Sequence, residues 1–148
     1  MSRKYKFRDP DGVYFVTFGT VYWIDVFSRP VYKDILVESI NYCVKEKGLV
    51  VYAWVIMTNH VHMIISSEGE KLEDILRDLK KFTAKTIIQE IKDNPKESRK
   101  DWMLWIASPE YRDLNEQERS YHIIHNTSFG SSITNLLHCI QKMIWRKS

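Results

Sequence analysis

Apolar and polar positions in the first half of the chain follow two different periods, each typical of one kind of secondary structure. The range 13–21 is rich in Val, Tyr, Phe and Thr, a composition that favours a strand. Over 31–47 the apolar residues recur at helical spacing, which predicts an amphipathic helix, and Gly48 follows where such a helix commonly ends. Two more apolar runs, 49–57 and 60–66, are predicted as strands, close enough in sequence to form an antiparallel hairpin.

A longer apolar stripe over 72–93 predicts the clearest helix of the chain, and Asn94–Pro95 ends it. Beyond Lys100 the pattern is weaker: 115–125 is polar and compatible with a helix, and 133–144 shows a last amphipathic helical pattern. The order strand–helix–strand–strand–helix predicts an α+β fold. We expect a ferredoxin-like (RRM-like) sandwich, in which an antiparallel sheet carries its helices on one face.

Composition indicates an ordinary globular protein that forms one domain. A length of 148 residues is sufficient for a single domain with its own core. The net charge of +3 permits an acidic partner such as nucleic acid, but does not require one. Cys43 and Cys139 match no zinc or disulfide framework, and no apolar run is long enough to span a membrane. We therefore expect a cytoplasmic protein with no membrane partner.

His60 and His62 are the first candidate functional residues, one position apart in the second strand of the predicted hairpin. Alternate side chains of a strand point to the same face, so the two imidazoles project together. Two adjacent imidazoles on a rigid strand are a ready pair of ligands for a divalent metal ion. The alternative is that they are polar residues on the wet face of a half-buried strand, and their spacing alone does not separate the two.

Basic side chains are in excess along the second predicted helix and just after it. From Arg77 to Lys100, eight basic residues stand against four acidic ones. A solvated helix face is the simpler explanation, and a surface that follows nucleic-acid phosphates is the functional one. The functional interpretation predicts these DNA-binding residues: Arg3, Lys4, Arg77, Lys80, Lys81 and Lys85.

The segment around the two histidines resembles the signature of the HUH single-tyrosine transposases, in particular their REP-associated branch. The segment is Tyr52-Ala53-Trp54-Val55-Ile56-Met57-Thr58-Asn59-His60-Val61-His62-Met63-Ile64-Ile65. The family carries a His-hydrophobic-His motif in a line reading roughly AWVIMPNHVHLLI, and Thr58 stands where proline is usual. The likeness also includes 14–18 and 71–83 and covers about residues 3–105. It implies one transposase-like domain over 1–148, with a family-like core at 1–105 and a divergent C-terminal region at 106–148.

This resemblance implies an enzyme that nicks and rejoins single-stranded or hairpin DNA. In such transposases a tyrosine hydroxyl attacks the scissile phosphate, forms a 5′-phosphotyrosine link and frees a 3′-OH. Two histidines and a third polar ligand hold Mg²⁺ or Mn²⁺, which implies His60 and His62 as metal ligands here. A phenol with a pKa of about 10 is a weak nucleophile, so a cation that positions and polarises the phosphate suits this chemistry. Family members are often homodimers, which implies a homodimer here.

The tyrosine half of the site can be aligned in two ways. The family line resembles YIHNNPVxAG, with an Asn or Gln four residues after the tyrosine as the third ligand. Aligning 124–126 with its IHN puts Ile123 at the nucleophile position. A shift by two residues puts Tyr121 there and His125 four residues later, on the same face of a helix. The second alignment implies Tyr121 as the nucleophile and His125 or Asn126 as the third metal ligand.

The divergent C-terminal region leaves three outcomes open. The protein is an active enzyme that uses Tyr121, a relative inactivated by a frameshift or deletion, or a family-like core joined to an unrelated tail. The rival function is therefore a DNA-hairpin-binding protein that keeps the fold and the basic helix but no longer cleaves, or a remnant without a partner. Tyr111 is a second, more distant candidate nucleophile.

Overall fold

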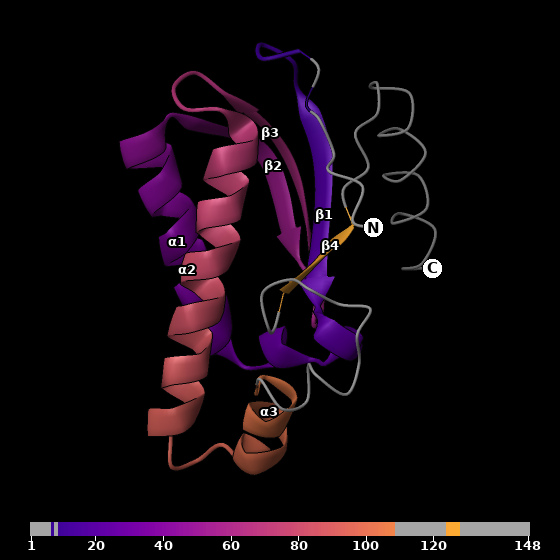
Figure 1. The fold of residues 1–148 in the computed structure, drawn as a ribbon, viewed down its shortest axis with the longest axis vertical. Helices are drawn as coiled ribbons and strands as arrows, with labels where there is room; N and C mark the ends of the chain where they lie inside the picture. The colour runs from indigo at the N-terminus through magenta and orange to yellow at the C-terminus, as the bar shows by residue number, and fades with distance from the viewer. Residues whose placement is uncertain (1–6, 8, 109–123, 128–148) are drawn as a thin grey trace.

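The computed structural model describes residue 7, residues 9–108 and, for its backbone, the segment 124–127. In this part of the chain four strands form one sheet, and two long helices pack on it (Figure 1). The elements follow in the order β1 (Tyr14–Thr20), η1 (Val21–Trp23), η2 (Val26–Ser28), α1 (Pro30–Lys47), β2 (Leu49–Ile56), β3 (His60–Ser67), α2 (Leu72–Asp93), α3 (Lys100–Ile106) and β4 (Ile124–Thr127).

The sheet has the spatial order β2-β3-β1-β4, and each neighbouring pair is antiparallel. Combined with the chain order, this is the arrangement of a ferredoxin-like sandwich, which confirms the predicted fold class. β3 and β1 are the two central strands, so residues on them are supported by a neighbouring strand on both sides. The β2–β3 hairpin turns through 57–59, where the amide of Met57 donates to the carbonyl of His60 (2.8 Å).

One face of the sheet packs on α1 and α2 and forms the core. Figure 1 shows both helices on the same side of the sheet. Alternate residues of the central strands are buried against them, among them Val16, Phe18, Val61 and Met63. Successive side chains of a strand point to opposite faces, so His60 and His62 lie on the face away from the helices. No helix in the described residues is long and apolar enough to cross a membrane.

The predicted and observed elements agree closely up to residue 93, and they differ after it. α2 spans 72–93 as predicted. The short helix α3 forms where the sequence pattern was weak. A helix over 115–125, with which the sequence is compatible, does not extend to the end of that range, because Ile124 begins β4, which pairs with β1. The free edge of β1 offers backbone hydrogen bonds that outweigh the weak helical preference of a polar segment. The helix predicted over 133–144 lies outside the described residues.

A close backbone contact connects the end of α1 to the turn before α2. Gly48 ends α1 with φ of 73°, in the left-handed region that favours glycine. A Cβ on Gly48 would lie 2.7 Å from the amide nitrogen of Gly69, and one on Gly69 would lie 2.6 Å from the carbonyl oxygen of Lys47. Side chains at either glycine would therefore push the two segments apart.

Candidate functional site

His60 and His62 lie side by side on β3. Their ring centroids are 4.7 Å apart, and the two planes are nearly perpendicular at 81°. His60 pairs with Gly19 of β1, and His62 pairs with Thr17. Val61, between the two histidines, is fully buried in the core. Because a slip of one residue would exchange the two faces of β3, burial of Val61 fixes both histidines on the face away from the helices.

Each histidine has its Nδ1 atom bound to a neighbouring side chain. Asn59 Oδ1 lies 2.6 Å from His60 Nδ1, and the Asn59 amide nitrogen donates to the carbonyl of Trp23 (3.1 Å), which orients the amide. Nδ1 of His60 is therefore the donor, and the neutral ring keeps its lone pair at Nε2. Thr17 Oγ1 lies 2.7 Å from Nδ1 of His62, and a hydroxyl can accept there in the same way. When Thr17 accepts, Nε2 is left in both rings as the atom that can bind a cation.

Both imidazoles are mainly neutral at pH 7. Burial lowers the pKa of His60, and burial followed by the neighbouring His60 ring lowers the pKa of His62. The histidine pair also lies between two aromatic rings: Phe15 stacks on His62 (5.5 Å, 16°), and Trp23 meets His60 at a steep angle (5.6 Å, 77°). The ring contacts restrict rotation of the imidazoles, while burial keeps them in the neutral form that binds metals.

The histidine pair fits two ligands of a metal site. In a metal-binding histidine the N–H of the second ring nitrogen usually donates a hydrogen bond to an oxygen. Both histidines have such an oxygen at Nδ1. No group of three His, Cys, Asp or Glu side chains within the described residues is arranged to hold a metal ion. The donors present therefore suit a divalent cation, and the site needs a further ligand to complete it.

β4 brings His125 into the same row of the sheet as His60, where a row means residues paired across adjacent strands. Gly19 pairs with His60 on one side and with His125 on the other. Asn126 occupies the next row, with Phe18 and Val61 of the core. His125 lies in a strand, so the helical spacing that the sequence suggested between positions 121 and 125 does not hold. Strand pairing brings His125 into this row instead, and residue spacing could not reveal it.

Gly19 lies between His60 and His125 in the row and has no side chain. A Cβ on Gly19 would lie 3.3 Å from the carbonyl oxygen of Asn59, 3.5 Å from Cβ of His60 and 3.8 Å from Cζ3 of Trp23. Gly48 is the one glycine with a positive φ in the described chain, so Gly19 does not serve an unusual backbone conformation. Its missing side chain instead lets Asn59, His60 and Trp23 approach one another.

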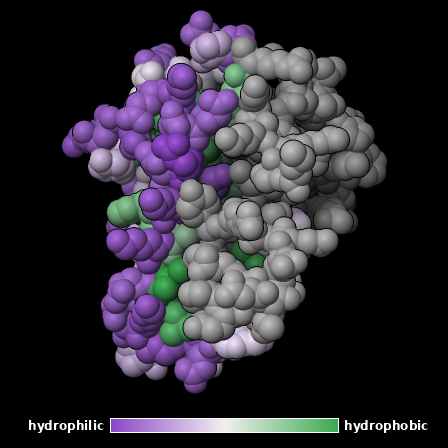
Figure 2. Space-filling view, viewed as in Figure 1, coloured by the Kyte–Doolittle hydropathy of each residue, from purple (hydrophilic) through white to green (hydrophobic). Residues whose placement is uncertain are grey.

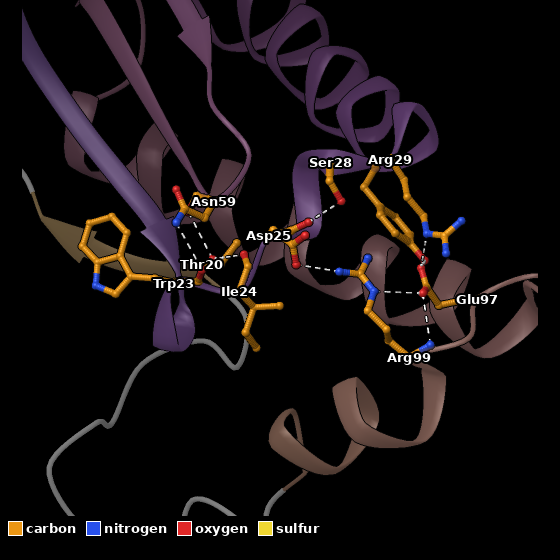
Figure 3. Close-up of polar contacts among 10 residues, drawn as sticks. Thr20, Trp23, Ile24, Asp25, Ser28, Arg29, Asn59, Glu97 and Arg99 are labelled. Atoms are coloured by element: carbon orange, nitrogen blue, oxygen red, sulfur yellow. Dashed lines mark hydrogen bonds and ion pairs between the residues drawn. The ribbon is translucent and has the colours of Figure 1, made fainter. Parts of the chain in front are cut away.

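The segment between β1 and α1 is a part of the site that sequence reasoning missed. Tyr22 and Trp23 have φ of 53° and 56°, a left-handed conformation that is rare for bulky residues. The Thr20 hydroxyl donates to the carbonyl of Ile24 (2.6 Å), and the Thr20 amide donates to the carbonyl of Asn59 (2.8 Å). Figure 3 shows Asn59 beside Thr20 and Trp23, with dashed contacts to both. No sequence signal marks this conformation, because aromatic residues do not favour it.

Glu97 is buried at the centre of a cluster of ion pairs and hydrogen bonds. Glu97 accepts from the Tyr32 hydroxyl (2.8 Å) and pairs with Arg29 (2.9 Å) and Arg99 (3.2 Å), and Arg99 also pairs with Asp25 (2.6 Å; Figure 3). Burial alone would raise the pKa of Glu97, but the hydrogen bonds from Arg99 and Tyr32 outweigh it and keep that pKa below its usual value. The cluster ties the segment before α3 to η2 and α1.

The predicted DNA-binding residues on α2 differ in accessibility. Lys81 and Lys85 are exposed, and Figure 2 shows a largely hydrophilic surface over the helical side of the molecule. Arg77 is exposed but paired with Asp74 (2.7 Å) and with the next residue, Asp78 (3.3 Å). Lys80 is only 8% exposed, and burial lowers its pKa to about 8. Its burial argues against a phosphate contact, because such a contact needs an accessible amine.

Four other candidates, Tyr121, Tyr111, Arg3 and Lys4, lie outside the described residues, so their roles stay predictions.

Comparison with known proteins agrees with this fold. Residues 12–113, more than half of the chain, match the family described as IS200-like transposases. No curated protein sequence gives a significant match. A REP-associated tyrosine transposase bound to a REP hairpin is similar in structure, with a TM-score of 0.56, 14% identity and coverage of 93% of this chain and 68% of that one.

A protein of Deinococcus radiodurans R1 that was assigned as a transposase is also similar in structure. Its TM-score is 0.53 at 17% identity, and the alignment covers 99% of this chain and 95% of that one. At these identities the two structures establish a shared fold, while the sequence match establishes the family. The resemblance noted around the two histidines is thereby confirmed, and the chain belongs to the IS200-like transposase family.

Proposed function

We propose that this protein is a metal-dependent transposase that nicks and rejoins single-stranded or hairpin DNA through a 5′-phosphotyrosine intermediate. The observation that carries the proposal is the pair His60 and His62, two neutral rings with Nδ1 bound to oxygen and Nε2 left for a cation. Family membership supports the reaction class. The similar REP-associated transposase is bound to a DNA hairpin, which supports the substrate class. The proposal places the protein in the cytoplasm with its DNA.

His60 and His62 would hold Mg²⁺ or Mn²⁺ through Nε2, and His125 is the proposed third ligand. Its position in the row of His60, with only a glycine between them, supports this choice. Asn126 is less suited, because its row is that of the buried core residues Phe18 and Val61. When bound, the cation supplies charge that polarises the scissile phosphate.

Tyr121 is the proposed nucleophile. Its hydroxyl oxygen bonds to the scissile phosphorus as the bond from phosphorus to the 3′ oxygen breaks, and the phenol loses a proton while the 3′ oxygen gains one. Attack of a 3′-hydroxyl on the phosphotyrosine reverses these steps and rejoins the strand. Two residues separate Tyr121 from Ile124, which pairs with Thr20 at the end of β1. Tyr121 itself lies outside the described residues, so its proposed role rests on the alignment with the family line.

DNA binding is proposed to use Lys81 and Lys85 on the exposed side of α2, with Arg77, Arg3 and Lys4 as further phosphate contacts. Each phosphate neutralised in single-stranded DNA should add about −0.7 to the slope of log affinity against log salt.

We also propose a homodimer, on the family resemblance alone, and sedimentation of the purified protein would test it.

A covalent-capture experiment tests the proposed reaction. The protein is incubated with Mn²⁺ and a pool of DNA hairpins that carry random single-stranded flanks, and protein–DNA adducts are separated under denaturing conditions and sequenced. We expect an adduct with the natural protein and with Tyr111→Phe, but none with Tyr121→Phe. An adduct that persists in Tyr121→Phe would refute Tyr121 as the nucleophile.

One observation favours a second function, hairpin binding without cleavage. The family match ends at residue 113, before Tyr121. A natural protein that shifts hairpin DNA in a gel but forms no adduct in Mn²⁺ would support this alternative. In that case His60→Ala and His62→Ala should leave hairpin affinity nearly unchanged, because no cleavage site would be involved.

A further inference from the structure

We propose that Trp23 is a stacking platform for an unpaired DNA base beside the histidine pair. The proposal rests on the proposed function for its ligand class, single-stranded DNA. Trp23 is 59% exposed, although an indole is among the most favourable side chains to bury. Its ring lies 5.6 Å from the His60 ring at 77°, so the two rings are not stacked and most of the indole surface stays accessible.

The backbone at Trp23 is strained, in the segment that carries the exposed indole. Tyr22 and Trp23 both have positive φ, a conformation that residues other than glycine and asparagine rarely adopt because the side chain crowds the backbone. A segment that served only to connect β1 to α1 would favour small residues here. Conformations of this kind persist where the surroundings enforce them, and they gather at functional sites.

Asn59, which orients His60, also holds the backbone of this segment. The Asn59 amide donates to the carbonyl of Trp23 (3.1 Å), and the oxygen of the same amide holds Nδ1 of His60 (2.6 Å). One side chain thus contacts both the backbone of Trp23 and the ring of His60. Figure 3 shows the indole directed away from the pair of Asp25 and Arg99, which anchors the far side of the segment (2.6 Å).

This arrangement matches the two parts of a nucleotide. A phosphate held at the histidines would bring its neighbouring base within reach of Trp23, because base and phosphate are joined through one sugar. Aromatic rings bind unpaired bases of any sequence, since every base has a flat π-face. The carboxylate nearest in sequence, Asp25, is neutralised by Arg99 and so does not repel the DNA strand.

Affinity for two probes tests this platform. The first probe is a DNA hairpin with a single-stranded thymine tail, and the second has the same backbone with an abasic tail. We expect Trp23→Ala to weaken binding of the thymine probe about 5- to 150-fold and to leave the abasic probe unaffected. Trp23→Phe should retain most of the affinity. The matched control is Trp102→Ala, which removes another half-exposed tryptophan (49%), on α3, and should bind both probes as the natural protein does.

Equal losses on the two probes, or no loss on either, would overturn the platform. Quenching of 2-aminopurine placed in the tail gives a second readout: we expect it with the natural protein and not with Trp23→Leu, and equal quenching by both proteins would also overturn it. These measurements are made without metal, so they do not depend on cleavage. If Trp23→Ala weakens binding of the thymine probe alone but no covalent adduct forms, nicking is refuted and the stacking role of Trp23 is supported. If an adduct forms but Trp23→Ala has the same effect on both probes, nicking is supported and the stacking role is refuted.

Discussion

The hydroxyl oxygen of Thr17 lies 2.7 Å from Nδ1 of His62, directly across the ladder between β1 and β3. Asn59 serves His60 in the same way from the preceding turn (2.6 Å). Each candidate ligand therefore has its own oxygen partner, supplied by a different element. The Asn59 oxygen makes Nδ1 of His60 the nitrogen that carries the hydrogen, while the Thr17 hydroxyl is a partner for Nδ1 of His62 in either tautomer.

Loss of the Thr17 hydroxyl should weaken metal binding without unfolding the sheet. Valine has nearly the same shape and favours strands, so Thr17→Val removes the hydrogen bond and little else. We expect Mn²⁺ affinity, measured by calorimetry, to fall about 10- to 100-fold. Thr86→Val on α2 is the control, because that hydroxyl donates to the carbonyl of Phe82 in its own helix, away from the histidines. Unchanged affinity in Thr17→Val, with binding abolished in His62→Ala, would show that Thr17 does not orient the ligand.

The two histidines should make the protein less stable as the pH falls below about 6.5. Burial lowers the pKa of both rings in the folded state, so below about 6.5 the unfolded chain binds more protons than the folded one. The free energy of unfolding should fall from there down to the folded-state pKa values and then level off. Urea unfolding at about pH 7.5 and about pH 5.5 measures this loss. In a double variant, His60→Gln with His62→Gln, the free energy of unfolding should fall less between the two pH values. An equal fall would show that the two histidines do not cause the pH dependence.

Two glycines should respond differently to alanine. Gly48 has a positive φ and no room for a Cβ against Gly69, so Gly48→Ala should lower the free energy of unfolding by about 1–3 kcal/mol. Gly19→Ala places its Cβ 3.3 Å from the carbonyl oxygen of Asn59, which should displace Asn59 and His60 and weaken Mn²⁺ binding at a smaller cost in stability. Urea unfolding and calorimetry on both variants give the comparison. The reverse pattern would contradict the assigned roles.

Glu97 should be needed for stability rather than for metal binding. Its side chain is fully buried and pairs with Arg29 and Arg99. Arg99 keeps its ion pair with Asp25 in Glu97→Gln, so the substitution leaves chiefly Arg29 poorly compensated. We expect the free energy of unfolding to fall by about 1–3 kcal/mol, a discounted value because both arginines are partly exposed. Glu90→Gln on the surface of α2 should change it by less than about 0.5 kcal/mol. A Glu97→Gln protein as stable as the natural one would show that the cluster contributes nothing net.

Thr83 offers a stabilising substitution. Its side chain is fully buried in α2, and its hydroxyl oxygen has no hydrogen-bond partner in the part of the chain that the structure describes. Thr83→Val removes that hydroxyl at nearly constant volume, so the free energy of unfolding should rise by about 1 kcal/mol. Thermal unfolding of Thr83→Val against Thr86→Val would measure it. A lower melting temperature in Thr83→Val would indicate that the hydroxyl is satisfied.

The sequence by itself determined the local elements and the first half of the site. Hydrophobic periodicity depends on neighbours within a few positions, and it predicted α2 with the bounds that the structure has. The period of two along β3 likewise put His60 and His62 on one face, opposite the buried Val61. The residues around them also carried the family resemblance that the match over 12–113 bears out.

Tertiary structure alone decided what surrounds the two histidines. Thr17 and His62 are 45 positions apart, and His125 joins the row of His60 through strand pairing instead of the expected helix. Lys80 belongs to a basic run, yet it turns toward the core and is buried. Each of these outcomes depends on which segments the sheet and the helices bring together. Hydrophobic periodicity reflects residues that are near one another in the sequence, so it does not predict contacts between distant segments.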